Sequence, residues 1–293
     1  MNVLVTGAGG FVGQHYIRTS GLTHHCIPAS LRNQNPEEIN LDDVDVVLHL
    51  AVVAHDPEMV NHDIQYKVNL DLTTQLADHA KLAGVKHFIF MSSVKVYGEG
   101  TDKVLNEDSV CIPVDAYGKS KLEAEKYLLQ QQTDNFAVAV IRPPLVYGPG
   151  VKGNMLRMLH LASKKIPLPF ANAHNRRSVV YIENLIALVN HIIEVRASGI
   201  YIAGDAVPVS TGELFMLIRA NLKGSRLLFP TPVVLQKLLR AVKPGLFNRL
   251  FGSFEVSNKS TNAKLKFIPP FTTEDGIKDM VSWYQTSLSK SPD

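Results

Sequence analysis

A tyrosine and a lysine four residues apart are the side chains in this sequence whose types and spacing best suit catalysis. Tyr117 and Lys121 lie in a segment of helical pattern, so both project from one face of a helix. A tyrosine phenol has an ordinary pKa of about 10 and acts as an acid or base near neutral pH only when a nearby cation favours its phenolate form. Lys121 is placed to supply that cation. We therefore expect Tyr117 to be an acid/base catalyst.

Two serines directly follow an apolar run that has the pattern of a strand. Ser92 and Ser93 come at the end of the run 86–91. Their hydroxyls should lie at the carboxyl edge of a sheet, where ligands bind in open α/β folds. A hydroxyl at that edge can hold a substrate oxygen beside Tyr117.

Three glycines stand between a valine-rich run and a helical pattern at the start of the chain. Gly7, Gly10 and Gly13 follow the strand expected at 3–6 and open the helix expected at 11–20. Gly7 allows a sharp turn with positive φ. Gly10 lets the backbone approach a pyrophosphate without a Cβ in the way, and Gly13 lets the helix pack close to the strand. The free N–H groups of that helix face the phosphates, so this turn predicts a dinucleotide-binding site.

Strand and helix patterns alternate through the first half of the chain. The expected strands are 3–6, 25–29, 44–50, 86–91 and 136–141, and the expected helices are 11–20, 64–83 and 116–132. This alternation predicts an α/β fold, a doubly wound parallel Rossmann sheet with a smaller C-terminal substrate-binding region. A helix at 182–195 and a strand at 199–202 should return to the sheet. We therefore assign residues 1–149, with 180–203, to the dinucleotide-binding domain, and residues 150–179 and 204–293 to the substrate-binding region.

Four motifs give the chain a resemblance, over essentially its whole length, to the extended short-chain dehydrogenase/reductase family. They are Gly7-x-x-Gly10-x-x-Gly13, Ser92-Ser93-x-x-Val96-Tyr97-Gly98, Tyr117-Gly-Lys-Ser-Lys121 and Arg142-Pro-Pro-Leu-Val-Tyr-Gly-Pro149. Within this family the chain most resembles the nucleotide-sugar enzymes related to UDP-glucose 4-epimerase. The pattern of that group also matches Lys152-Gly153-Asn154 and the run from Arg176 to Tyr181.

The resemblance implies a role for each matching residue. It implies that Ser93 holds the reacting sugar oxygen, that Tyr117 is the acid/base, and that Lys121 lowers the pKa of Tyr117 and binds the nicotinamide ribose. The implied substrate-binding residues are Ser93, Lys95, Asn154 and Arg177, of which the last contacts the nucleotide diphosphate. The implied cofactor-binding residues are Gly7, Gly10, Phe11, Val12, Gly13, Ser30, Arg32, Leu50, Ala51, Asn69, Tyr117, Lys121 and Pro144.

Four departures from the family pattern bear on the reaction. The region after the second strand has no carboxylate for the ribose of NAD, and Ser30 and Arg32 could accommodate a 2′-phosphate, so the cofactor is NAD or NADP, with NADP favoured. Val94 and Lys95 stand where the sugar dehydratases carry Asp-Glu, which argues against dehydration. Val94 also replaces the cysteine of the fucose-synthase branch. Leu145 replaces an asparagine that many epimerases use on the sugar phosphate.

Hydride transfer at C4 of a hexose is the reaction that remains. A 4-epimerase and an NADPH-dependent UDP-4-keto-hexose(amine) reductase both stay open, and the resemblance favours the epimerase. A non-catalytic NAD(P) redox sensor is a remote alternative, because such relatives usually lose the tyrosine found here at position 117. A small-alcohol or steroid dehydrogenase is disfavoured by Asn154 and Arg177, which would have no diphosphate to bind.

Composition sets the remaining expectations. The chain of 293 residues has a net charge of +3 with scattered charges, so we expect no nucleic-acid partner. Its two cysteines and 11 histidines form no spaced ligand set, so we expect no metal. A core strand at the start of the chain and the lack of ~18 uninterrupted apolar residues predict a cytoplasmic protein. The resemblance, in turn, implies a UDP-linked substrate and a homodimer formed through helices 64–83 and 116–132.

The segment 227–251 is both apolar and basic. Lys237, Arg240, Lys243 and Arg249 alternate there with Leu, Val and Phe. An amphipathic basic stretch of this kind can lie on a membrane surface. We interpret it instead as a pair of helices of the substrate-binding region, broken at Pro244-Gly245, so peripheral membrane contact stays open but is not expected.

Overall fold

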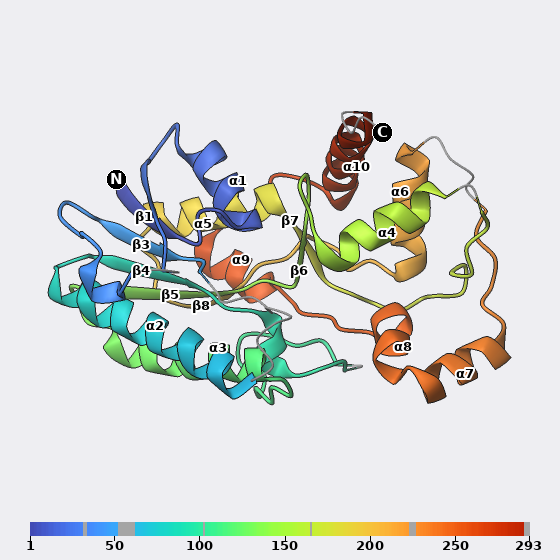
Figure 1. Ribbon diagram of the computed structural model, residues 1–293, viewed down its shortest axis with the longest axis horizontal. Helices are drawn as coiled ribbons and strands as arrows, with labels where there is room; N and C mark the ends of the chain where they lie inside the picture. The colour runs from blue at the N-terminus through green and yellow to red at the C-terminus, as the bar shows by residue number, and fades with distance from the viewer. Residues whose placement is uncertain (32–33, 52–61, 102, 165, 223–226, 290–293) are drawn as a thin grey trace.

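A six-stranded parallel sheet forms the centre of the molecule (Figure 1). The computed structural model describes residues 1–31, 34–51, 62–101, 103–164, 166–222 and 227–289. The strand order is β2-β1-β3-β4-β5-β8, and every neighbouring pair is parallel. The strands are β1 (Asn2–Thr6), β2 (His25–Ala29), β3 (Val46–His49), β4 (His87–Met91), β5 (Ala137–Arg142) and β8 (Gly199–Ile202). The predicted fold class is therefore confirmed, with strand limits that differ by at most two residues.

The central strands are apolar on both sides because helices cover both faces of the sheet. All positions of β4 and β5 are buried, which is typical of parallel strands between two helical layers. Helices α1 (Phe11–Ser20) and α5 (Ile182–Glu194) lie on one face, and α2 (His62–Leu82) and α3 (Ala116–Gln131) lie on the other (Figure 1). Each layer builds its own core, around Tyr16 and Leu185 on the first face and around Leu76 and Leu128 on the second.

The chain reverses its direction of travel across the sheet at β1. It runs outward from β1 to β2 and then crosses back to add β3 on the other side of β1. The loops that leave β1 and β3 therefore diverge at their carboxyl ends. A crevice at such a switch point is where open α/β sheets bind their ligands.

The rest of the chain forms a smaller part beside the carboxyl ends of the strands. Strands β6 (Leu145–Tyr147) and β7 (Val179–Tyr181) pair in a second, two-stranded parallel sheet, which the sequence patterns do not predict. Asp205 fastens this sheet, because its carboxylate accepts hydrogen bonds from the Tyr147 hydroxyl at 2.7 Å and the Tyr181 amide at 3.0 Å. The helices of this part are α4 (Gly153–Ser163), α6 (Thr211–Asn221), α7 (Val233–Val242), α8 (Pro244–Phe251), α9 (Lys259–Leu265) and α10 (Thr273–Ser289).

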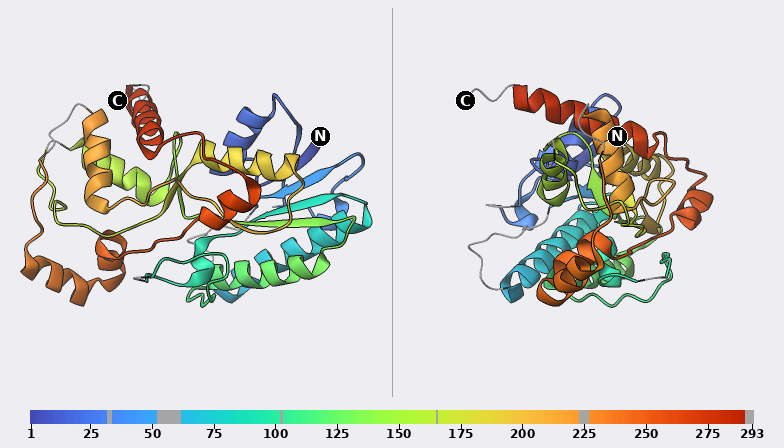
Figure 2. Two further views of the ribbon diagram at one scale, coloured as in Figure 1. Left: turned by 180° about the vertical axis from the view of Figure 1, so that it is seen from behind. Right: turned by 90° about the vertical axis from the view of Figure 1, so that its right-hand side faces the viewer.

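Helices α7 and α8 lie at the end of the molecule farthest from β1 and β2 (Figure 2). They are the two helices predicted in 227–251, and the break between them falls at Lys243, one residue before the expected Pro244-Gly245. Among the helices that the structure describes, none is both long and apolar enough to cross a membrane.

Candidate active site

The glycine turn between β1 and α1 leaves no room for side chains. Gly7 has a φ of +70°, and a Cβ added to it would lie 2.8 Å from the backbone nitrogen of Ala51, at the end of β3. A Cβ on Gly13 would lie 2.4 Å from the carbonyl oxygen of Gly7. Gly10 is the N-cap of α1, and its amide donates to the Gly7 carbonyl at 2.9 Å. The turn is thus a cradle of bare backbone at a helix N-terminus, which fits the pyrophosphate of a dinucleotide.

The other residues expected around the cofactor follow the strands at this edge. Leu50 and Ala51 come directly after β3 and are half-buried, as are Phe11 and Val12 in the first turn of α1. Ser30 is exposed just beyond β2 and Asn69 lies half-buried in α2, while Pro144 is buried between β5 and β6. Arg32 lies outside the described residues, so only Ser30 represents the expected 2′-phosphate contacts in the structure.

Four of the expected catalytic and substrate-binding residues meet at the carboxyl end of β4. Ser93 caps the short 3₁₀-helix η2 (Val94–Tyr97), and its hydroxyl accepts a hydrogen bond from the Lys95 amide at 3.3 Å. Tyr117 stands in the first turn of α3, with Lys121 one turn further on. The ammonium nitrogens of Lys121 and Lys95 lie 5.9 and 6.0 Å from the centre of the Tyr117 ring.

Burial dominates the proton affinities in this cluster. It raises the pKa of Tyr117 to about 12, with a further increase from the negative charge of Asp115, while a hydrogen bond with Ser93 acts in the opposite direction. Burial also lowers the pKa of Lys121 to about 7. The shift expected for Tyr117 was a decrease caused by Lys121, so the structure has the opposite direction. The reason is that burial of the phenol itself is the largest influence on its pKa, while Lys121 is also buried and donates a hydrogen bond to the Met91 carbonyl at 2.8 Å.

A carboxylate beside Tyr117 was missed by the sequence reasoning. Asp115 is the N-cap of α3, where its carboxylate accepts a hydrogen bond from the Gly118 amide at 2.7 Å, and it forms an ion pair with Lys95. Its position just before a strong helical pattern is an N-cap signal that could have revealed it. This ion pair partly neutralises the charge of Lys95. Lys121, the other cation near Tyr117, forms none of the salt bridges found among the described residues.

A buried ion pair fastens α3, the helix that carries Tyr117 and Lys121, to the sheet. Glu125, one turn after Lys121, accepts hydrogen bonds from Arg142 at 2.5 to 3.2 Å and from the Ser92 hydroxyl. Both charged side chains are almost fully buried. The guanidinium of Arg142 also donates to the Tyr97 hydroxyl at 2.8 Å. The network therefore links α3, β4, β5 and η2 directly behind Ser93 and Tyr117.

The two residues expected on the diphosphate side lie in the smaller part of the molecule. Asn154 is exposed in the first turn of α4. Arg177 is half-buried, and its guanidinium donates to the carbonyls of Asn248 at 3.2 Å and Gly252 at 3.0 Å. Burial, with a contribution from Arg249, lowers the pKa of Arg177 from its ordinary value. Within the described part of the chain Arg177 has no carboxylate partner, and such a cation suits an anionic ligand.

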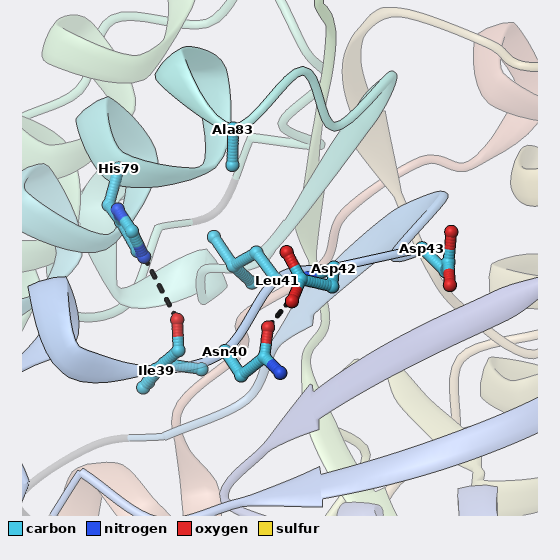
Figure 3. Close-up of a pocket in the computed structure, with 7 residues that line it drawn as sticks. All are labelled: Ile39, Asn40, Leu41, Asp42, Asp43, His79 and Ala83. Atoms are coloured by element: carbon cyan, nitrogen blue, oxygen red, sulfur yellow. Dashed lines mark hydrogen bonds between the residues drawn. The ribbon is translucent and has the colours of Figure 1, made fainter.

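A surface hollow elsewhere in the molecule has none of these features. It is lined at the amino edge of the sheet by Ile39, Asn40, Leu41, Asp42, Asp43, His79 and Ala83 (Figure 3). His79 is bound to the Ile39 carbonyl at 2.9 Å, and Asn40 accepts a hydrogen bond from the Asp42 amide at 2.8 Å. Two of its polar side chains are thus hydrogen-bonded within the hollow, which lies at the opposite edge of the sheet from Ser93 and Tyr117. No group of histidine, cysteine and acidic residues suited to a metal ion occurs among the described residues.

Comparison with known proteins agrees with the fold and the motifs. Residues 3–204 match the model of the NAD dependent epimerase/dehydratase family. The chain is 34% identical to a UDP-glucose 4-epimerase of Vibrio cholerae, over 94% of this chain and 93% of that protein. It is 28% identical to the N-acetyl-alpha-D-glucosaminyl-diphospho-ditrans,octacis-undecaprenol 4-epimerase of Escherichia coli O157:H7, over 68% of this chain and 65% of that protein.

The fold is shared with solved structures of sugar-nucleotide complexes. The structure of MoeE5 with UDP-glucose and NAD superimposes with a TM-score of 0.73 and covers 98% of this chain and all of that chain, at 24% identity. The glycine cradle, the serine, tyrosine and lysine at one sheet edge, and the match over two thirds of the sequence lead to one assignment. The chain belongs to the NAD dependent epimerase/dehydratase family and is an NAD(P)-dependent enzyme.

Proposed function

We propose that this protein is a UDP-glucose 4-epimerase-like enzyme, which inverts C4 of a hexose carried on a diphosphate. The observation that supports this most is the cluster of Ser93, Tyr117 and Lys121, which lies on the same edge of the parallel sheet as the glycine cradle. It occurs in a chain that matches a 4-epimerase over 94% of its length. Both relatives described above are named as 4-epimerases of diphosphate-linked sugars.

Tyr117 is the proton carrier in the proposed reaction. Ser93 holds the C4 oxygen, and Tyr117 removes its proton as hydride leaves the carbon. The phenolate must be stabilised by positive charge because its pKa is about 12 in the buried site. Lys121 is the group placed to do this, whereas Asp115 partly neutralises Lys95. Gly7, Gly10 and Gly13 would hold a nicotinamide dinucleotide, which would supply reversible hydride acceptance. Tyr117 would return the proton after the keto sugar presents its other face.

Arg177 is the proposed contact to the diphosphate. Its guanidinium is half-buried, is held by two backbone carbonyls, and has no carboxylate partner among the described salt bridges. A planar guanidinium binds phosphate oxygens in pairs, which favours arginine over lysine here. Asn154 is a further proposed substrate contact. We propose UDP as the carrier, on the strength of the relative with the higher identity.

The proposed function also includes a cofactor type, a division into two binding regions and a dimeric assembly. We propose that NADP is accepted, because the region after β2 offers Ser30 and no acidic side chain to the ribose. Residues 1–149 with 180–203 would bind the dinucleotide, and residues 150–179 and 204–293 the substrate. A homodimer through α2 and α3 is expected, and light scattering tests it.

The cofactor content of the purified protein separates the epimerase from a 4-keto reductase. An epimerase regenerates its cofactor in every cycle, so the protein should retain close to one dinucleotide per chain and invert UDP-glucose or UDP-N-acetylglucosamine without added cofactor. Tyr117→Phe should keep the dinucleotide and lose about 10²- to 10⁴-fold in turnover. Protein that purifies without dinucleotide and consumes one NADPH per turnover of a UDP-4-keto sugar would instead be the reductase.

A further inference from the structure

Helix α7 exposes an apolar face that the described part of the chain does not cover. No residue of α7 or α8 is buried. In α7 the side chains of Val234, Leu238 and Val242 follow one another at a spacing of four, so they form one stripe along the helix. They are 78%, 58% and 66% exposed. From the sequence we expected two helices packed in the substrate-binding region. Both helices form, but α7 buries none of its side chains.

The segment that carries this stripe is strongly basic. Residues 214–254 contain seven lysines and arginines and no acidic residue, whereas the whole chain has a net charge of only +3. Four of these cations belong to α7, α8 and the residue between them, namely Lys237, Arg240, Lys243 and Arg249. At helical spacing on α7, Arg240 falls on the side opposite the apolar stripe and Lys237 falls beside the stripe, so the helix combines an apolar face with neighbouring positive charge.

The second helix holds this element firmly on the molecule. Phe251 of α8 lies 6.3 Å, ring centre to ring centre, from Phe170. Arg240 of α7 stacks over the Phe247 ring at 5.7 Å. The carbonyls of Asn248 and Gly252 accept the hydrogen bonds of Arg177. Helix α8 therefore attaches the pair of helices to the rest of the substrate-binding region, and α7 lies at the outer end of the molecule (Figure 2).

We propose that α7 and α8 form a membrane-docking element, which lies on an anionic lipid bilayer with Val234, Leu238 and Val242 entering the headgroup region. An exposed apolar stripe beside several cations and no acidic side chain is the pattern of helices that lie in a membrane interface. Anionic lipid headgroups neutralise the cations, and the acyl region receives the stripe. A second copy of this chain is a poorer occupant, since a symmetric contact would bring two sets of like charges together. The element thus places Arg177 and its substrate site close to a membrane surface.

Vesicle flotation of the full chain tests this without requiring activity. Protein is mixed with vesicles of phosphatidylcholine alone or of phosphatidylcholine with phosphatidylglycerol, and the floating fraction is measured at low and high salt. We expect binding to the anionic vesicles at least about tenfold stronger than to the neutral ones, and weaker with salt. Val234→Asp/Leu238→Asp and Lys237→Glu/Lys243→Glu should each lose about tenfold in binding, with unchanged turnover of a water-soluble nucleotide sugar.

The matched control carries the same change on an exposed apolar site elsewhere. Leu22 and Ile268 are 92% and 84% exposed, so Leu22→Asp/Ile268→Asp should leave vesicle binding unaltered. Failure to float with anionic vesicles at low salt would overturn the proposal, as would equal binding to neutral vesicles. Light scattering supplies the other outcome that overturns it: if the α7 variants turn a dimer into a monomer, the stripe is a contact between copies. The lysine variants keep the test valid should the aspartates disturb folding.

Discussion

Replacing Arg142 by methionine removes the cation from a fully enclosed ion pair. Arg142 donates to both carboxylate oxygens of Glu125, and both side chains are at most 3% exposed. In Arg142→Met the carboxylate of Glu125 would stay buried with the Ser92 hydroxyl as its remaining hydrogen-bond donor in the network. The Tyr97 hydroxyl would lose its partner as well.

The expected loss of stability arises because the Glu125 carboxylate would remain buried and charged without its cation, and less from the loss of the attraction itself. Breaking a buried pair by removing one partner costs about 3–5 kcal/mol, whereas replacing both partners by apolar groups is often nearly neutral. We therefore expect Arg142→Met and Glu125→Leu each to lower the free energy of unfolding by about 3–5 kcal/mol. The double variant should recover most of that loss. Since the network lies directly behind Ser93 and Tyr117, the single variants should also lose turnover.

Urea unfolding of the wild type, both single variants and the double variant measures these differences as a double-mutant cycle. The expected coupling is several kcal/mol. Exposed ion pairs such as that of Lys126 with Glu123 provide the control, and Lys126→Met should change the stability by less than about 1 kcal/mol. Single variants at position 142 or 125 that stay within about 1 kcal/mol of the wild type would refute the reasoning.

Three further predictions concern groups whose environments the structure defines. Burial lowers the pKa of Lys121 from 10.5 to about 7, so its folded form resists protonation at a pH where the unfolded chain accepts it. Lys121→Met should therefore be more stable than the wild type in thermal unfolding at pH 7, by an amount that shrinks as the pH rises to 10, and a constant difference would contradict this. Burial lowers the pKa of His49 to about 3 and of His87 to about 4, so the free energy of unfolding should fall below about pH 6.5 by about 1.4 kcal/mol per pH unit for each histidine. In His87→Gln, urea unfolding at several pH values should show a pH dependence of the unfolding free energy that is smaller by about 1.4 kcal/mol per pH unit. An unchanged pH dependence would show that His87 does not cause it. Gly13→Ala should destabilise the protein by about 1–3 kcal/mol and release its dinucleotide, because the new Cβ would lie 2.4 Å from the Gly7 carbonyl oxygen. Gly9→Ala is the control, since its Cβ would meet no atom within 4 Å, and equal dinucleotide retention by both variants would count against the cradle.

Local patterns in the sequence determined most of the fold. The valine-rich runs, the glycines of the first turn and the alternation of strand and helix each depend on residues close together in the chain, so they predict the six-stranded sheet and its helices. The spacing of Tyr117 and Lys121 puts both on one helix face for the same reason. The sequence did not predict strands β6 and β7, because a strand of three residues is too short to show an alternation of apolar and polar side chains.

Long-range contacts decided what the sequence could not show. The pairing of Glu125 with Arg142 joins residues 17 positions apart through packing of α3 on β5. The pKa of Tyr117 depends on burial and on Asp115, so its direction could not be inferred from the Lys121 spacing alone. The sequence pattern of the basic, apolar segment 227–251 is the same whether other parts of the protein pack on its apolar stripe or leave it exposed. Only the tertiary structure shows that none of the described residues covers the stripe of α7, because burial depends on which elements come together in space and not on the sequence of the helix itself.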